Sequence, residues 1–201
     1  MPATVVVPSM PTPLTPSSGP TWTVHPDGSL SATAAARTDI FIDPAGGIVK
    51  LDAATLLAPA PDGDLQFSAR VTVDFRADFD AGVLLLWFDD RHWAKLCFEY
   101  SPTGQPMVVS VVNREVSDDA NAFVVEGDTV WLRISRIGSV WAFHASTDGE
   151  FWHMVRMFAL DASTIPRLGF EVQSPTGDSC AVTFADIHLA PSTLIDARNG
   201  S

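Results

Sequence analysis

The clearest pattern in the chain is an alternation of apolar and polar residues across residues 65–76. The apolar positions are Leu65, Phe67, Ala69, Val71, Val73 and Phe75. Successive side chains of a strand point to opposite faces. The pattern therefore predicts a long strand with one face in the core and the other toward water.

Residues 82–100 predict two more strands, joined by a polar turn at residues 89–92. The first is a continuous apolar run, Val83 to Phe88, which is typical of a central strand covered on both faces. The second alternates, so Trp93, Lys95 and Glu99 share one face, with Cys97 between them. These side chains could line a ligand-binding surface, or the charged ones could form a cross-strand ion pair on a solvated sheet.

The rest of the chain reads as short strands separated by turn signals about every eight to twelve residues, which predicts an all-β sandwich or barrel. Three stretches are less regular. Residues 50–58 are expected to form a short helical turn or a loop, and residues 161–164 one helical turn. Residues 113–122 are polar and acidic and are expected to form a loop.

The domain organisation follows from composition. Residues 1–20, rich in Pro, Ser and Thr, are expected to be a flexible arm or an extension along a sheet edge. Residues 21–190 are expected to be a single β-sandwich domain, and residues 191–201 a loose tail. The two cysteines, Cys97 and Cys180, are expected to be free thiols. No secretory signal or membrane span is recognisable, so a cytoplasmic location is expected.

The charge balance restricts the partners. The chain has 12 Lys and Arg against 24 Asp and Glu, a formal net charge of −12. Without a basic stripe to neutralise phosphates, nucleic acid and anionic membranes are excluded as expected partners. The acidity favours solubility and selects no particular ligand.

Residues 146–152 fit the pattern S-x-D-G-x-x-W, which resembles the Asp-box hairpin of many carbohydrate-active β proteins. The carboxylate of Asp148 can accept backbone N–H bonds across the turn, Gly149 can supply positive φ, and Trp152 can pack beneath. Turn chemistry explains each of these residues, so the motif predicts a hairpin and carries little information on function.

Candidate catalytic and metal-binding groups are sparse. Asp118, Asp119 and Asn121 gather oxygen atoms, but calcium needs six to eight, so no metal and no cofactor are predicted. Glu99 and Glu171 could form an acid pair on one sheet face, as glycoside hydrolysis requires. Neither an E-x-D-x-E strand nor a G-x-S-x-G elbow is present. No catalytic residue is therefore assigned, and a non-enzymatic role is favoured.

Several motifs together resemble a known family. These are H-W-A-K-L-C-F-E-Y at 92–100, V-V-S-V-V-N-R-E-V-S-D-D-A-N at 108–121, W-L-R-I-S-R at 131–136, F-H-A-S-T-D-G-E-F-W at 143–152 and T-D-I-F-I-D-P at 38–44. They resemble the regulation-of-enolase-type domain of unknown function (DUF1349-like), in the concanavalin A-like lectin/glucanase superfamily. The likeness covers about residues 65–189 and residues 38–44. It departs at residues 113–115, Asn-Arg-Glu, where Thr-Arg-Gly is expected.

The resemblance implies a jelly-roll sandwich of two antiparallel sheets, one of them concave, and no established reaction. Superfamily relatives bind or cleave saccharides on the concave sheet. By this analogy, Lys95 and Glu99 would lie on that sheet. The expected neighbours are Asp39, Arg133 and His144, and the expected rim is Asp118, Asp119 and Asn121.

The first hypothesis is a non-catalytic carbohydrate-binding module whose site is centred on Trp93, Lys95 and Glu99, because aromatic rings stack on sugars while polar groups bind hydroxyls. One alternative is a glycoside-active enzyme in which Glu99 acts with a second carboxylate such as Glu171. Another is a protein-interaction or regulatory domain, including a homodimer formed through sheet edges or the Pro-rich arm.

Overall fold

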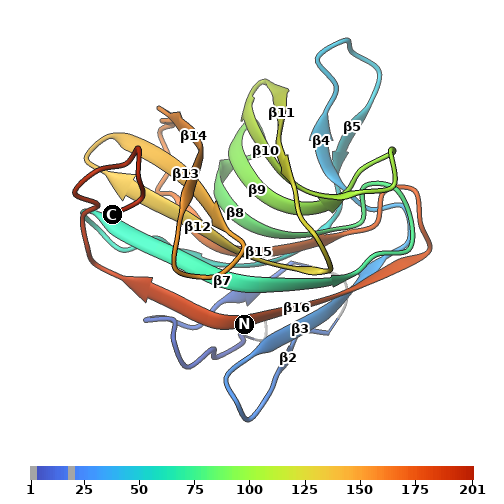
Figure 1. Ribbon diagram of the computed structural model, residues 1–201. Helices are drawn as coiled ribbons and strands as arrows, with labels where there is room; N and C mark the ends of the chain where they lie inside the picture. The colour runs from blue at the N-terminus through green and yellow to red at the C-terminus, as the bar shows by residue number, and fades with distance from the viewer. Residues whose placement is uncertain (1–3, 18–20) are drawn as a thin grey trace.

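The protein forms two stacked antiparallel sheets of seven strands each in the computed structural model, which describes residues 4–17 and 21–201 (Figure 1). The first sheet has the order β1 (Thr15–Pro16), β6 (Ala54–Pro59), β15 (Arg167–Gln173), β8 (Ala81–Asp89), β9 (His92–Tyr100), β10 (Pro106–Arg114), β11 (Val116–Val124). The second has the order β14 (His153–Phe158), β13 (Val140–Ser146), β12 (Thr129–Ile137), β7 (Leu65–Asp74), β16 (Ser179–Ala190), β3 (Leu30–Ala35), β2 (Thr23–Val24). A separate hairpin joins β4 (Ile40–Ile42) to β5 (Val49–Leu51). This architecture confirms the predicted jelly-roll sandwich.

The main core lies between the two sheets and is built by the alternation seen in the sequence. On β7 every second residue from Leu65 to Val73 is buried. The core-facing residues of β9 include Leu96 and Phe98, which are also fully buried. At Gly82 an added Cβ would lie 2.6 Å from side-chain atoms of Val71 and Val182. Glycine at this position therefore lets β8 approach the second sheet.

The hairpin of β4 and β5 covers part of the outer face of the first sheet and stands beside β11 in Figure 1. Ile40 and Ile42 pack against Leu85 of β8 and Trp93 of β9. The backbone N–H of Ile42 donates to Oγ of Ser117 on β11 at 3.0 Å. Strand β8 is consequently covered on both faces, as its continuous apolar sequence predicted.

Three local predictions were wrong. Residues 50–58 contain most of β5 and of β6, and β6 is an inner strand that pairs with both β1 and β15. Residues 113–122 are largely strand, since β11 runs from Val116 to Val124; its polar composition reflects an edge position with most side chains exposed. Residues 161–164 form no helical turn; the chain bends at residues 163 and 164.

The two ends of the chain are attached to the sandwich wherever they are described. Val7, Met10 and Leu14 are buried in the main core, and β1 pairs with β6. Residues 4–17 therefore form the edge extension rather than a mobile arm, and residues 1–3 and 18–20 lie outside the described residues. The C-terminal tail is not loose, because Leu194 is buried and the tail lies against β12 and β13 (Figure 1).

Several smaller predictions also bear on the chemistry. Cys97 and Cys180 are buried free thiols, as expected. The carboxylate of Asp148 accepts the N–H groups of Glu150 and Phe151 at 2.8 and 2.9 Å, and Gly149 has φ 79°, which confirms the Asp-box hairpin. Among the described residues there is no helix of the length and hydrophobicity needed to cross a membrane.

Glu115 explains the departure from the family pattern at residues 113–115. It stands where glycine was expected, and its φ is 68°. That left-handed conformation is uncommon for residues other than glycine. The backbone therefore keeps the glycine-type turn between β10 and β11 although the side chain differs.

Candidate functional site

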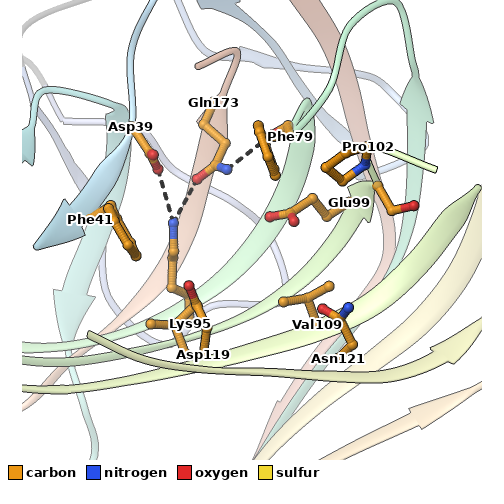
Figure 2. A pocket seen from close by; sticks show the side chains of 12 residues that line it. Asp39, Phe41, Phe79, Lys95, Glu99, Pro102, Val109, Asp119, Asn121 and Gln173 are labelled. Atoms are coloured by element: carbon orange, nitrogen blue, oxygen red, sulfur yellow. Dashed lines mark hydrogen bonds and ion pairs between the residues drawn. The ribbon is translucent and has the colours of Figure 1, made fainter. Parts of the chain in front are cut away.

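A cavity of about 440 Å³ opens on the outer face of the first sheet (Figure 2). It is lined by Asp39, Phe41, Phe79, Lys95, Glu99, Ser101, Pro102, Val109, Val111, Asp119, Asn121 and Gln173. Strands β9, β10 and β11 supply its floor, and the residues around β4 and the loop before β8 supply its sides. A volume of this size is typical of small-molecule sites.

Lys95 is the central cation of the cavity, although its side chain is only 3% exposed. Its ammonium donates to Oε1 of Gln173 at 2.8 Å and to Oδ1 of Asp39 at 3.1 Å. Oε1 of Glu171 lies 4.0 Å away. Burial alone would lower the pKa of Lys95, but the charges of Asp39 and Glu171 raise it above its ordinary value. Lys95 is therefore a charged and fully engaged group.

Asp39 is held in position by the local backbone. Its N–H donates to Oδ1 of Asp52 at 2.9 Å, and its carbonyl accepts the N–H groups of Asp52 and Ala53. Its own carboxylate also accepts the N–H of Ile40 at 2.7 Å. Because Ile40 is anchored against the first sheet, Phe41, the next residue of β4, is presented to the cavity.

Phe79 forms the second aromatic wall in an unusual backbone conformation. The φ angle of Phe79 is 69°, and 37% of the residue surface is exposed. A bulky residue in this region costs about 1–3 kcal/mol and persists where the surroundings enforce it, often at functional sites. Here the Phe79 N–H donates to the Tyr100 carbonyl at 2.7 Å, and Nε2 of Gln173 donates to the Phe79 carbonyl at 3.0 Å. Gln173 thus links Lys95 to the Phe79 backbone (Figure 2).

Buried Asp80 fixes the loop that carries Phe79. Its Oδ2 accepts the N–H groups of Arg76 and Ala77, each at 2.9 Å. Its Oδ1 accepts the hydroxyl of Ser174 at 2.7 Å. Three donors to one buried carboxylate close the turn between β7 and β8, so Phe79 is held over the cavity by a rigid loop.

Two carboxyl groups near Lys95 have raised pKa values. Burial raises the pKa of Glu99 to about 8, with Lys95 opposing this effect and Asp39 and Asp119 adding to it. Burial likewise raises the pKa of Glu171 to about 7, again opposed by Lys95. Glu99 lines the cavity, whereas Glu171 is fully buried and lies outside the lining. Neither carboxyl receives a hydrogen bond from any described residue.

Five of the residues singled out from the sequence meet at this cavity: Asp39, Lys95, Glu99, Asp119 and Asn121. Trp93 does not. It shares their sheet face, with its ring centroid 6.0 Å from Nζ of Lys95, but it is 0% exposed beneath Ile40 and Ile42. A ring covered in this way cannot stack on a ligand in the cavity.

Asp118 faces away from the cavity, because neighbouring residues of β11 point to opposite sides. Its carboxylate pairs with Arg156 at 3.4 Å. The expectation that Arg133 and His144 lie beside Lys95 was wrong, because both residues belong to the second sheet. Nη2 of Arg133 donates to the Gly200 carbonyl at 2.6 Å, and Nε2 of His144 lies 2.7 Å from the Ala197 carbonyl. The C-terminal tail covers both.

Sequence reasoning missed Phe41, Phe79 and Gln173. Phe41 had a signal, since it alternates with Ile40 and Ile42 in the T-D-I-F-I-D-P segment that belongs to the family pattern. Phe79 had none, because its role depends on a positive φ enforced by distant residues. Gln173 acts through contacts with Lys95 and Phe79, both far away in the sequence.

The cavity shows no arrangement suited to a metal ion. In the part of the chain that the structure describes, no group of three or more His, Cys, Asp or Glu side chains is placed to hold one. Lys95 occupies the centre of the carboxyl groups, so the local chemistry is that of a charged, hydrogen-bonding surface flanked by aromatic rings.

The fold and this cavity define a concanavalin A-like jelly-roll sandwich with a mixed aromatic and polar pocket on the outer face of one sheet. The chain belongs to the family described as "Protein of unknown function (DUF1349)", whose model matches residues 17–192. No curated protein sequence matches the chain.

Solved structures share this fold at low sequence identity. A functionally unknown protein from Saccharomyces cerevisiae matches with a TM-score of 0.75 and 23% identity, over 85% of this chain and 95% of that chain. The glycoside hydrolase family 43 protein BlXynB from Bacillus licheniformis matches with 0.66 and 14%, over 85% of this chain and 34% of that chain. The carbohydrate-binding module CBM66 from Bacillus subtilis matches with 0.52 and 13%, over 85% and 91%. This chain thus spans about a third of the hydrolase and nearly all of the module.

Proposed function

We propose that the protein is a non-catalytic, lectin-like module that binds a saccharide in the cavity on the outer face of the first sheet. The observation that carries this proposal is the pairing of two aromatic residues with a set of polar groups in one cavity. Phe41 and Phe79 supply the rings, and Lys95, Glu99 and Asn121 are among the polar groups.

This combination suits the chemistry of a sugar. A sugar ring presents apolar C–H faces, which pack on aromatic rings, and hydroxyl groups, which exchange hydrogen bonds with carboxyl and amide groups. The rigid loop behind Phe79 and the hydrogen bonds around Lys95 hold these groups in place before a ligand arrives. Such preorganisation lowers the entropic cost of binding.

The comparisons support the proposal at the level of fold. The carbohydrate-binding module from Bacillus subtilis is a protein of this architecture over nearly its whole length. At 13% identity, however, its residues cannot be transferred, and a ligand is inferred from the cavity of this chain alone.

Binding is favoured over hydrolysis because the acid pair of the alternative hypothesis, Glu99 with Glu171, is not available to a substrate. Glycoside hydrolysis needs two carboxyl groups that flank the scissile bond. Glu171 is 0% exposed and does not line the cavity, so it cannot complete a catalytic pair with Glu99.

Isothermal titration calorimetry against a panel of neutral mono- and oligosaccharides tests the proposal. We expect at least one ligand to bind, and Asn121→Ala and Phe79→Ala to weaken that binding at least about fivefold through loss of a hydrogen bond or a stacking surface. Asp118→Ala is the matched control, because its side chain lies on the opposite side of β11 and pairs with Arg156 at the surface. No binding across the panel, or equal binding by all three variants, would overturn the proposal.

A further inference from the structure

The cavity carries more negative charge than its own cation can balance. Three carboxyl-bearing residues line it, namely Asp39, Glu99 and Asp119, and Lys95 is the one Lys or Arg in the lining. The ammonium of Lys95 is already engaged by Asp39 and Gln173 and lies 4.0 Å from Glu171 beneath. The hydrogen bonds of the Lys95 ammonium are thus used within the protein, and Glu99 and Asp119 feel its charge but have no cation in direct contact.

Arg156, the other cation near this cavity, does not neutralise its excess negative charge. Arg156 donates to the carbonyl and the carboxylate of Asp118 at 3.1 and 3.4 Å, on the far side of β11. Its charge lowers the pKa of Asp119 only as a lesser effect, and burial together with Asp39 keeps that pKa above its ordinary value. Asp119 therefore remains an acid without a direct partner among the described residues that line the cavity.

Glu99 is the cavity residue whose carboxyl group most clearly lacks hydrogen-bond donors. Its carboxyl is largely buried at the cavity wall and receives no hydrogen bond from any described residue (Figure 2). Removing a carboxylate from water without a donor is costly, and a charged donor that enters the site recovers this cost. The cavity thus presents a carboxyl group without a hydrogen-bond donor next to the aromatic rings that would hold a sugar. Its pKa of about 8 leaves Glu99 mostly protonated at pH 7 in the free protein, and an ammonium placed against it favours the carboxylate.

We infer that the ligand class is a saccharide that bears a protonated amino group, with its ammonium paired to Glu99 and its ring held by Phe41 and Phe79. This inference rests on the proposed function, because it specifies the saccharide that the same cavity takes. An ammonium supplies both the positive charge and the hydrogen-bond donors that Glu99 lacks. Asp119 adds to the attraction, and the net charge of −12 favours the approach of a cation.

Three tetramers with the same β-1,4-linked backbone test the inference, because they differ mainly at C2: the glucosamine tetramer, the N-acetylglucosamine tetramer and cellotetraose. Calorimetry at pH 7 is expected to show at least about tenfold tighter binding of the glucosamine tetramer than of the other two, the effect of one close ion pair. Glu99→Gln should remove most of this preference, and Asp119→Asn should reduce it. Asp118→Asn should leave it unchanged, which controls for general attraction to an acidic protein.

The outcomes separate the inference from the function beneath it. Equal binding of all three tetramers, or a preference that survives Glu99→Gln in a variant that melts like the wild type, overturns the amino-sugar inference and leaves the saccharide module standing. Binding of 1,5-diaminopentane as tight as that of the glucosamine tetramer, with no saccharide bound otherwise, overturns both. Absence of binding by every tetramer also overturns both.

Discussion

The ammonium of Lys95 lies 3.1 Å from Oδ1 of Asp39, which joins the floor of the first sheet to the hairpin that covers it. The two residues are 56 positions apart, and the contact is mostly buried. The ion pair therefore has a structural role, since it holds Asp39 and β4 over the sheet and places Phe41 at the cavity. It also neutralises the one cation in the cavity lining.

Lys95→Met is expected to lower the free energy of unfolding by about 3–5 kcal/mol, because it leaves the carboxyl groups of Asp39 and Glu171 buried without a cation. Urea unfolding measures this loss. The double variant Lys95→Met/Glu171→Gln should recover part of the free energy of unfolding that Lys95→Met loses, because it also removes one of the two unpaired carboxyl groups. Lys50→Met, which changes the other lysine of the chain, should cost less than about 1 kcal/mol. A loss in Lys95→Met no larger than in Lys50→Met contradicts this account.

Thermal stability should fall as pH rises from 6.5 to 8.5. Glu99 and Glu171 have folded-state pKa values of about 8 and about 7, above their ordinary values. At a pH between the unfolded-state and folded-state pKa of each glutamate, the folded state therefore binds more protons than the unfolded state. Their contribution is fully present below the unfolded-state pKa and is lost as pH passes through the folded-state values. A pKa that differs by one between the folded and unfolded states corresponds to about 1.4 kcal/mol, so the midpoint of thermal unfolding should fall by at least about 2 °C.

The double variant Glu99→Gln/Glu171→Gln is the control for that pH dependence and should show a flatter profile. His144 acts in the opposite direction, because burial lowers its pKa and its protonation costs stability as pH falls below about 6.5. His144 still acts just above pH 6.5, and the raised pKa values of the buried thiols of Cys97 and Cys180 contribute toward pH 8.5. The difference between the wild type and the double variant, which retains these groups, therefore reports the two glutamates. A wild-type midpoint that stays constant or rises over this interval is inconsistent with the assignment.

Gly200→Ala is expected to release the C-terminal tail from the second sheet. An added Cβ would lie 2.7 Å from Cβ of Trp152 and 2.8 Å from Nη2 of Arg133. Exposure of His144 should then move its pKa up toward the ordinary value, which an NMR titration of the imidazole resonances records. Gly138→Ala shares the positive φ but meets no atom within 4 Å, so it should leave His144 unchanged. An unaltered His144 titration in Gly200→Ala would argue against the docked tail.

The sequence predicted the faces of the strands better than what covers them. Alternation placed Trp93 on the same face as Lys95 and Glu99, and the structure agrees. It could not show that Ile40 and Ile42 would lie over Trp93, because that contact depends on where a hairpin far away in the sequence docks. Because Trp93 is buried, it cannot be the stacking surface that the sequence predicted, and Phe41 and Phe79 line the cavity instead.

The same limit explains Arg133 and His144. They were expected beside Lys95 only by analogy with the family, and strand order decides to which sheet they belong. Strand β12 pairs with β7 and β13, whereas β9 pairs with β8 and β10. These pairings join distant segments, and no local pattern in the sequence specifies them. Asp39 was nevertheless placed correctly beside Lys95, through the family motif that contains it.

Mapping a bound saccharide by backbone amide chemical shifts tests the central claim most directly. Cellotetraose and the glucosamine tetramer are each titrated into the ¹⁵N-labelled protein. We predict that the largest shifts occur at Phe41, Phe79, Lys95, Glu99 and Asn121, around one cavity on the first sheet. Shifts concentrated around Arg133 and His144 on the second sheet, or no shifts with either tetramer, would contradict it.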